Sequence, residues 1–286
     1  MENQTVIRRM TASDVGLGMM LKDMAGWNQL RGDWERLLAA EPDGCFVAEV
    51  AGTGVGTCTT IAYERLFGWV GMVLVHPDYR RRGIGRALLD AGIDHLEGLG
   101  VSAVKLDATP MGKALYDTMG FVDEYGLERW LGRGLASVKR VPGMRQLTID
   151  DLGAILALDA AVFGADRGRL LNLLLTDPSV RVAGRCTDEG ELSGYVAVRP
   201  GQKAAYLGPL VAENADVATA LWEWGRGTVG DLPTFVDVLL PNRAAVELVQ
   251  SSGFEKQREF IRMYRGRNTS PGRPEWQYAI LGPEVG

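Results

Sequence analysis

The sequence predicts a mixed α/β fold built from two tandem copies of one unit. Three observations support this. The chain has 286 residues, 46% of them hydrophobic and 23% charged, which is long for one core and ordinary for two domains. Short β-type runs alternate with amphipathic helical runs in the first half. The pattern of the first half then returns in the second.

The internal repeat consists of three pairs of similar segments in the same order along the chain. The pairs are residues 6–14 with 143–151, 69–73 with 206–210, and 115–121 with 248–254. A stretch rich in Gly and Pro, residues 131–143, separates the two sets and is the expected linker. We therefore predict an N-terminal domain over residues 1–136 and a diverged C-terminal domain over residues 137–286.

Composition excludes several classes of protein. The formal net charge of −5 argues against general nucleic-acid binding, and no apolar run is long enough to cross a membrane. The three cysteines are scattered and do not suggest a disulfide framework. The two histidines stand outside any cluster of metal ligands, which argues against a zinc site. The first residues lack the features of a secretory signal. We expect a cytoplasmic protein without a metal, a nucleic-acid partner or a membrane anchor.

The elements of the first copy follow from periodicity. Two β-type runs at 46–49 and 57–63 flank a glycine-rich turn, which predicts a hairpin. The run at 69–75 predicts a buried strand, and 101–106 predicts the next one. Between them, apolar residues recur at helical spacing from Arg86 onward. The repeat predicts the same order for the second copy.

The loop between the buried strand and this helix carries the strongest functional signal. It holds four arginines, Arg80, Arg81, Arg82 and Arg86, on an otherwise acidic chain. Gly83 and Gly85 allow a tight turn and a close approach of the backbone to a ligand. The first amides of a helix lack internal partners and point into such a loop. This combination predicts a site that binds an anion, and a phosphate group fits it best.

At these residues the sequence resembles the GNAT superfamily of acyl-CoA-dependent N-acetyltransferases. Its pyrophosphate loop reads Arg or Gln, two residues, Gly, one residue, Gly or Ala, which Arg80, Gly83 and Gly85 match. Residues 114–121 also resemble the late helix of that family and the Gly-Phe that follows it. The resemblance implies two tandem GNAT-like domains, each a mixed, mostly antiparallel twisted sheet flanked by helices. It also implies acetyl-CoA as co-substrate.

The family's cofactor contacts transfer onto matching positions of this chain. The resemblance implies that the loop holds the CoA pyrophosphate through backbone amides and that the preceding strand binds pantetheine like an added strand. The expected cofactor-binding residues are Val73, Leu74, Val75, Arg80, Arg81, Arg82, Gly83, Ile84, Gly85, Arg86, Thr109 and Tyr116. Thr109 stands where many members have Asn, so its reach toward the cofactor is shorter.

The second copy lacks the parts of this site. It passes from residues 210–214 almost directly into its helix, without the glycines and arginines, and Glu213 stands near the place of an anion. Val249 replaces Tyr116, while Asn242 matches Thr109. More narrowly, segments 26–29, 106–109 and 279–284 resemble a group of bacterial two-domain GNAT proteins with a diverged C-terminal half. We expect no CoA site in the second copy, which is expected to shape or cover the cleft.

Tyr116 and Asp107 are the candidate catalytic residues. Acyl transfer to an amine expels CoA as a thiolate, which the phenol of Tyr116 can protonate. Asp107, at the end of the strand 101–106, is the candidate base, although an acid at a strand end also commonly caps a turn. The aromatic and amide side chains Trp27, Asn28, Tyr63 and Trp69 are expected to border the acceptor.

The sequence therefore predicts acetyl transfer from acetyl-CoA to a small-molecule or terminal amine. Two alternatives remain open at this point. One is a non-catalytic acyl-CoA-binding or sensing module. The other is a tandem transferase like mycothiol synthase, which would need an active second copy. The acceptor, and the choice between monomer and homodimer, do not follow from the sequence.

Overall fold

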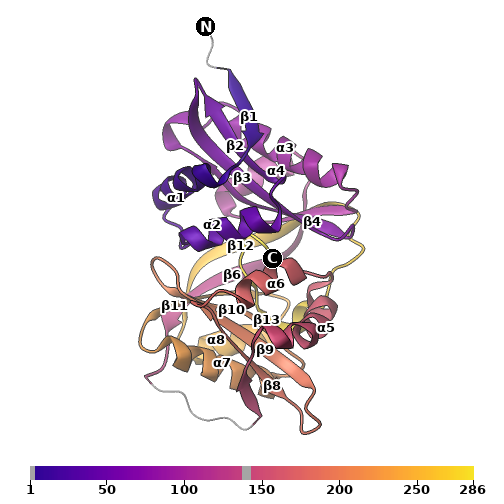
Figure 1. Ribbon diagram of the computed structural model, residues 1–286. Helices are drawn as coiled ribbons and strands as arrows, with labels where there is room; N and C mark the ends of the chain where they lie inside the picture. Colours follow the sequence, from indigo (N-terminus) through magenta and orange to yellow (C-terminus); the bar gives the residue numbers. More distant parts are fainter. Residues whose placement is uncertain (1–3, 137–142) are drawn as a thin grey trace.

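A computed structural model describes residues 4–136 and 143–286 and shows two similar units joined through one sheet (Figure 1). The first half contains β1 (Thr5–Arg9), α1 (Val15–Met24), α2 (Arg31–Ala40), β2 (Cys45–Val50), β3 (Thr53–Tyr63), β4 (Phe67–Val75), α3 (Ile84–Gly98), β5 (Ala103–Ala108), α4 (Pro110–Asp117) and β6 (Val122–Arg133). The second half contains β7 (Met144–Gln146), α5 (Leu152–Phe163), α6 (Gly168–Leu175), β8 (Arg181–Cys186), β9 (Leu192–Arg199), β10 (Ala205–Ala212), α7 (Ala215–Val229), β11 (Pro233–Leu239), α8 (Arg243–Ser251), β12 (Glu255–Gly266) and β13 (Gln277–Ala279).

The fold is mixed α/β with a mostly antiparallel sheet, as the sequence predicts. The strands follow the order β1-β2-β3-β4-β5-β12-β6-β11-β10-β9-β8-β7, and β13 pairs with β10 off this path. Most neighbours are antiparallel; β4 with β5 and β10 with β11 are parallel. Element order in the second half repeats that of the first, which explains the sequence repeat.

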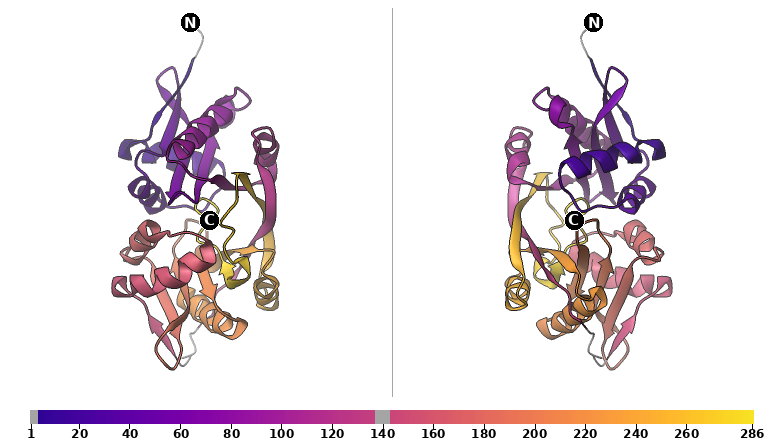
Figure 2. Two further views of the ribbon diagram at one scale, coloured as in Figure 1. Left: turned by 90° about the vertical axis from the view of Figure 1, so that its right-hand side faces the viewer. Right: turned by 90° about the vertical axis from the view of Figure 1, so that its left-hand side faces the viewer.

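The two halves exchange their last long strands. Strand β12 of the second half pairs with β5 of the first, and β6 of the first half pairs with β11 of the second. The exchanged strands also pair with each other, and Figure 2 shows them side by side between the units. The predicted division between residues 136 and 137 follows the chain, whereas each spatial unit includes one strand from the other half.

A matched pair of buried ion pairs fixes this exchange. The guanidinium of Arg262 on β12 donates to both carboxylate oxygens of Asp107 on β5, at 2.9 and 3.0 Å. In the same way Arg129 on β6 donates to both oxygens of Asp237 on β11, at 2.8 and 2.6 Å. All four side chains are buried. Bidentate geometry makes each contact directional as well as strong.

Helices cover both faces of the sheet. Helix α3 packs on β2, β3 and β4, and α7 packs on β8, β9 and β10. On the other face, α2 of the first unit packs against α6 of the second, and one apolar cluster continues across both units. Trp34 and Phe163 are among its buried members. The units therefore share a core and do not depend on the linker alone.

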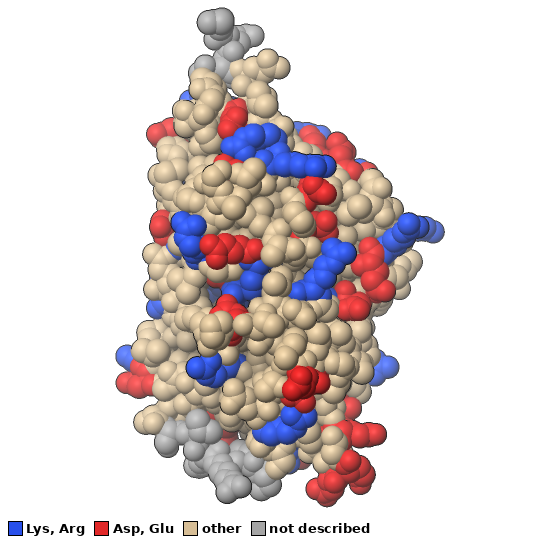
Figure 3. All heavy atoms as spheres, viewed as in Figure 1, with Lys and Arg blue, Asp and Glu red and all other residues tan. Residues whose placement is uncertain are grey.

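The surface carries mixed charge. On the face drawn in Figure 3, acidic and basic side chains are interspersed among uncharged residues. That face does not present the extended basic field that general nucleic-acid binders use. Among the described residues, no helix combines the length and the apolar character needed to cross a bilayer.

Candidate active site

Strand β4 separates from β5 after three residues and opens a gap in the sheet. The two strands pair in parallel only from Phe67 with Ala103 to Trp69 with Lys105. Further along, the ladder with β3 passes from Gly71 to Leu74 and skips Met72 and Val73, which form a β-bulge. Met72 is buried and has a φ of 49°, in the left-handed region. A bulge leaves backbone groups outside the ladder, as is common beside active sites.

The predicted anion loop joins the end of β4 to α3. Arg81 and Gly83 both have left-handed φ angles, 61° and 78°, so the chain turns sharply before the helix. Gly83 is the N-cap of α3 and offers no side chain to the first amides of the helix. Those amides are therefore available to an anion. A Cβ on Gly85 would lie 3.8 Å from Leu115 and from Val75, within the space that a ligand would use.

A cleft of about 890 Å³ runs from this loop along β4 to α4. It brings together nearly all the side chains that the sequence predicts to hold the cofactor: Val73, Leu74, Val75, Arg80, Arg81, Gly83, Ile84, Gly85, Arg86, Thr109 and Tyr116. Arg82 is the exception. Its guanidinium donates to the carbonyl of Asp78 at 2.8 Å and stacks on Tyr79, so it supports the loop from outside the lining.

Tyr116 lies at the inner end of the cleft. Helix α4 begins after Thr109, whose hydroxyl accepts a hydrogen bond from Gly112 at 3.3 Å. A Cβ on Gly112 would come within 2.9 Å of the Tyr116 ring, so glycine lets the ring lie against the helix. Phe121 meets the same ring edge to face. Burial raises the pKa of Tyr116 above its ordinary value, which keeps the phenol protonated at neutral pH.

Beyond Tyr116 the cleft continues into a second, small pocket of about 80 Å³. Trp27, Val73, Thr109, Tyr116 and Arg258 line both spaces, so the two are continuous. The bulge of β4 forms one wall of the pocket, and two carboxylates, Asp107 and Glu284, belong to the others. A ligand that extends along the cleft would thus end between Tyr116 and these carboxylates.

Asp107 is engaged by Arg262 in the ion pair described above. Its side chain is fully buried, and both oxygens accept hydrogen bonds from the guanidinium. Burial acts to raise the pKa of Asp107, and the guanidinium opposes that shift. The predicted catalytic base therefore borders the pocket but has both oxygens committed to an arginine. Its role as the base stays a prediction.

The last segment of the chain forms another wall of the pocket. The indole of Trp69 donates to the carbonyl of Pro283 at 3.0 Å, and the hydroxyl of Tyr63 donates to that of Val285 at 2.6 Å. Gly71 lies beside the bulge. A Cβ atom at this position would lie 2.4 Å from the carbonyl oxygen of Glu284, so only glycine allows this close approach. These contacts place Glu284 next to the bulge of β4.

Three of the four side chains expected to border the acceptor have structural contacts instead. Trp69 and Tyr63 are buried and hold residues 283–285. Asn28 is buried as well: its amide donates to Ala204 at 2.9 Å and accepts from Lys203 at 2.8 Å, tying the first half to the second. Only Trp27 of this set lines the pocket. For the other three, contact with the acceptor stays a prediction.

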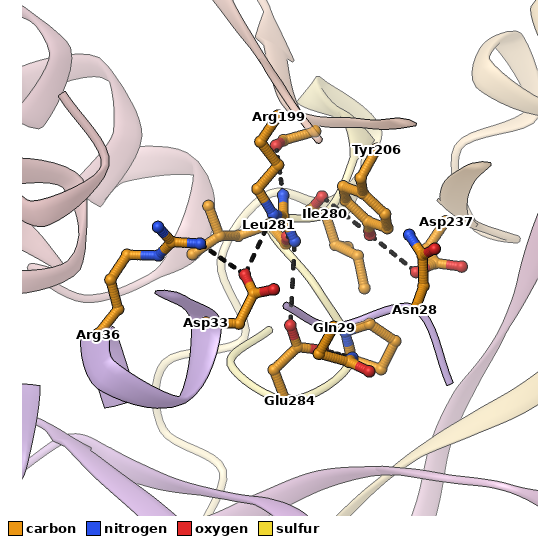
Figure 4. A network of polar contacts seen from close by, with 12 residues as sticks. Asn28, Gln29, Asp33, Arg36, Arg199, Tyr206, Asp237, Ile280, Leu281 and Glu284 are labelled. Atoms are coloured by element: carbon orange, nitrogen blue, oxygen red, sulfur yellow. Dashed lines mark hydrogen bonds and ion pairs between the residues drawn. The ribbon is translucent and has the colours of Figure 1, made fainter. Parts of the chain in front are cut away.

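Sequence reasoning missed Glu284. Figure 4 shows it between Gln29 and Arg199, in a network that joins α2, β9 and the last segment. Gln29 donates to its carboxylate at 3.2 Å, and Arg199 lies 3.9 Å from the other oxygen. Burial raises the pKa of Glu284 above its ordinary value of 4.5. The sequence offers one weak signal, an acidic residue within a segment that resembles related proteins.

The second copy has a different arrangement at the matching place. Only Glu213 and Asn214 lie between β10 and α7. Asn214 caps α7, and its side-chain oxygen accepts a hydrogen bond from the amide of Val217 at 3.0 Å. In α3 the corresponding cap is Gly83, which has no side chain to bind the first amides of the helix. In addition, β13 pairs with β10 and Ile280 donates to Asp237 on β11 at 3.1 Å. The chain itself thus lies between the two parallel strands.

Residues 4–136 and 143–286 contain no group of three or more His, Cys, Asp or Glu side chains arranged to hold a metal ion. The polar groups around the cleft and the pocket instead include arginines, the open amides at the start of α3, two tyrosines, Tyr79 and Tyr116, and two carboxylates. Chemically this set suits an anionic, elongated ligand whose reacting end reaches an acid and a base.

Comparison with known families matches both halves. The model of the acetyltransferase (GNAT) family matches residues 20–121, and that of an acetyltransferase (GNAT) domain matches residues 155–279. The first match contains the bulge, the loop, α3 and Tyr116. The second contains the elements that repeat them, without the glycine loop.

Known relatives agree with this. The chain is 25% identical to holothin acyltransferase of Pseudoalteromonas sp. (strain SANK 73390), covering 91% of this chain and 87% of that protein. It is 41% identical to mycothiol acetyltransferase of Propionibacterium freudenreichii, over 33% of this chain and 31% of that protein.

Solved structures share the fold. A putative acetyltransferase from Pyrococcus horikoshii superposes with a TM-score of 0.86 at 24% identity, covering 100% of this chain and 97% of that one. A tandem GNAT protein from the clavulanic acid biosynthesis pathway gives 0.65 at 18% identity, covering 92% and 98%. The chain therefore belongs to the GNAT superfamily of acetyltransferases and carries two GNAT domains in tandem.

Proposed function

We propose that this chain transfers the acetyl group of acetyl-CoA to an amine, and that the first unit alone carries the reaction. The observation that supports it best is the continuous path from the arginine-rich loop, along β4, to Tyr116 and the two carboxylates. The family supports a transferase; the cofactor, the amine acceptor and a cytoplasmic location are parts of the proposal.

The loop and β4 fit acetyl-CoA as co-substrate. The open amides at the start of α3 and the arginines around them suit its diphosphate. Residues 73–75 line the gap where β4 and β5 have separated, which suits the narrow pantetheine arm. When bound, this co-substrate supplies an acyl group activated as a thioester.

Tyr116 is the proposed proton donor to the departing sulfur. Its raised pKa favours the protonated phenol, the form that a general acid needs. Tyr116 lines both the cleft and the pocket, so its hydroxyl suits a role at the end of the path that the cofactor would follow. Positioned proton transfer of this kind contributes about 10²–10⁴-fold in rate.

The second unit, within the proposed domain 137–286, is assigned no cofactor. Three features support this. Its loop lacks the glycines and arginines, Asn214 caps the helix where a diphosphate would bind, and β13 with Ile280 lies in the gap between β10 and β11. A mycothiol-synthase-like mechanism with two active copies is therefore not favoured. The second half of the chain instead supplies Pro283 and Glu284 to the pocket of the first unit.

The test is acetyl-CoA binding by calorimetry together with release of free thiol in the presence of amines. We expect binding of one acetyl-CoA per chain and thiol release that depends on the amine added. Binding with only slow, amine-independent thiol release would favour the non-catalytic acyl-CoA-binding module. Absence of binding would reject both.

A further inference from the structure

We propose that the pocket beyond Tyr116 recognises an amine that carries an acidic group, with Glu284 taking the proton from the amine and Arg258 binding the acid. This inference rests on the proposed function and names its base and its acceptor class. It assigns a catalytic residue to a segment that the sequence places 168 positions after Tyr116 (284 − 116).

The first step is the contrast between the two carboxylates of the pocket. Asp107 has both oxygens bound by the guanidinium of Arg262. Glu284 receives one side-chain hydrogen bond, from the amide of Gln29, and its nearest cation, Arg199, lies 3.9 Å away. Arg199 directs its own hydrogen bonds to the carbonyls of Gly208 and Leu281. Glu284 therefore keeps lone pairs for a bound proton donor.

The second step is an acceptor atom next to Glu284 that lacks a donor. The side-chain oxygen of Gln29 is buried, and in the described part of the chain no hydrogen bond reaches it. Gln29 and Glu284 both line the pocket. A buried oxygen without a partner is costly, and an amine or ammonium group with several N–H bonds would satisfy it. The two side chains together form a site for nitrogen donors.

The third step is the position of Glu284 relative to the reacting end of the cleft. Gly71 lets the backbone of Glu284 come against β4 immediately before the bulge at Met72. Trp69 and Tyr63 fix the neighbouring carbonyls. The carboxylate held in this way borders the same pocket as Tyr116, so one bound acceptor can reach both the acid and the base.

The surroundings of Glu284 suit a base. Burial raises its pKa; Arg199 on β9 and Arg129 on β6 act to lower it, and Asp33 on α2 acts to raise it. The other charged groups of the pocket are the Asp107–Arg262 pair and Arg258. A carboxylate with a raised pKa accepts a proton from a bound ammonium group more readily than an exposed one does.

Arg258 supplies the second half of the recognition. It lines both the cleft and the pocket, and its guanidinium lies 5.9 Å from the centre of the Phe260 ring. Among the residues that the structure describes, this guanidinium makes no ion pair and no hydrogen bond. Burial and the neighbouring Arg129 lower its pKa. A partly buried guanidinium without an anion suits a carboxylate on the incoming amine, because charge-assisted hydrogen bonds offset the cost of burial.

The proposed step balances as follows. Glu284 takes one proton from the bound ammonium group, and the neutral amine forms an N–C bond to the acetyl carbonyl carbon. The C–S bond breaks with its electron pair on sulfur, which takes the proton of Tyr116. The second amine proton replaces the one that Tyr116 gave up, and Glu284 returns its proton to solvent, giving the amide, free CoA thiol and one released proton.

The test uses α-amino acids, each beside the amine that remains when its carboxyl group is replaced by hydrogen, with thiol release as the readout. We expect the intact chain to use amino acids with a lower KM than the matched amines. Glu284→Gln should lower kcat by about 10²–10⁴-fold with unchanged acetyl-CoA affinity. Arg258→Met should raise the KM for the amino acids about 10- to 100-fold and leave the matched amines unaffected.

Glu275→Gln is the matched control, because it makes the same change at an exposed site of the same part of the chain. Hydroxylamine, whose nitrogen is mostly deprotonated at neutral pH, separates base from scaffold: Glu284→Gln should retain turnover with it. Loss with every nucleophile would assign Glu284 a structural role and overturn the proposal. So would wild-type turnover in Glu284→Gln, or transfer to none of the amino acids.

Stability gives a readout independent of turnover. A carboxyl group whose pKa is raised by folding stabilises the fold below its unfolded pKa, and this contribution is lost as pH rises through the folded pKa. Glu284→Gln should therefore unfold at a higher temperature than the intact chain above pH 4.5. Equal or lower stability would contradict the buried, charged base. Failure of the intact chain to bind acetyl-CoA would instead reject the proposed function.

Discussion

The two units of this protein share a sheet, a helix order and a matching buried ion pair each, but they differ in the space between the two parallel strands. In the first unit, residues 76–83 form a turn whose last residue, Gly83, leaves the amides of α3 free. In the second, Asn214 caps α7 and β13 fills the gap beside β10. The difference teaches how one fold can leave a helix start and a strand gap open in one copy and fill both with its own chain in the other.

The shared ion pairs teach a complementary lesson. Asp107 with Arg262 and Asp237 with Arg129 occupy corresponding places in the two units, each joining an exchanged strand to its new neighbour. The unit without a cleft retains its pair. Because the same ion pair occurs in the unit to which we assign no cofactor, the fold alone explains Asp107, which makes it a weaker candidate for the base than Glu284.

The largest effect is expected at the turn that distinguishes the units. Gly83→Glu places a side chain on a left-handed residue and a negative charge at the open amides. Because at least two charge-assisted hydrogen bonds are lost, acetyl-CoA affinity should fall about 100-fold or more by calorimetry. The control is Gly190→Glu, which has a φ of +90° and open space in a hairpin of the second unit. Equal acetyl-CoA affinity for both variants would reject the assignment of this loop as the diphosphate site.

Next in size is the phenol that the second unit lacks. Tyr116→Phe should slow thiol release about 10²–10⁴-fold while acetyl-CoA affinity stays the same, since only the proton donor is removed. Tyr264→Phe, outside both cavities, serves as the control. A rate equal to that of the intact chain with a good acceptor would leave Tyr116 as a packing residue only.

The ion pairs test whether the units are alike in construction. Asp107→Asn and Asp237→Asn each leave a buried arginine without its charge partner, so each should lower the free energy of unfolding by about 3–5 kcal/mol. Chemical denaturation measures both. If Asp107→Asn instead kept full stability and lost turnover, Asp107 would be the base and the two units would differ here as well.

The smallest effect is expected in the second unit. Glu213→Arg removes the negative charge near the matching anion position but neither opens the gap beside β10 nor uncaps α7. Binding should stay at one acetyl-CoA per chain by native mass spectrometry. A second bound molecule in this variant would mean that charge alone closes the site.

Sequence reasoning predicted the parts of the site that lie close together along the chain. Arg80 to Gly85, β4 and Tyr116 belong to one continuous stretch with recognisable spacing, and the structure gathers them around one cleft. Glu284 could not be found this way, because its position depends on the strand exchange and on the path of the last segment past β10. For the same reason Tyr63 and Trp69 resembled pocket aromatics, although their polar atoms hold that segment.

The central claim is that one polypeptide holds one acetyl-CoA, with its diphosphate at the start of α3 and its thioester beside the bulge of β4. A crystal structure with acetyl-CoA tests this most directly. We expect a single molecule whose diphosphate meets the amides of residues 83–85 and whose acyl end lies between Tyr116 and Glu284. A molecule between β10 and β11, with residues 277–281 displaced, would contradict the account.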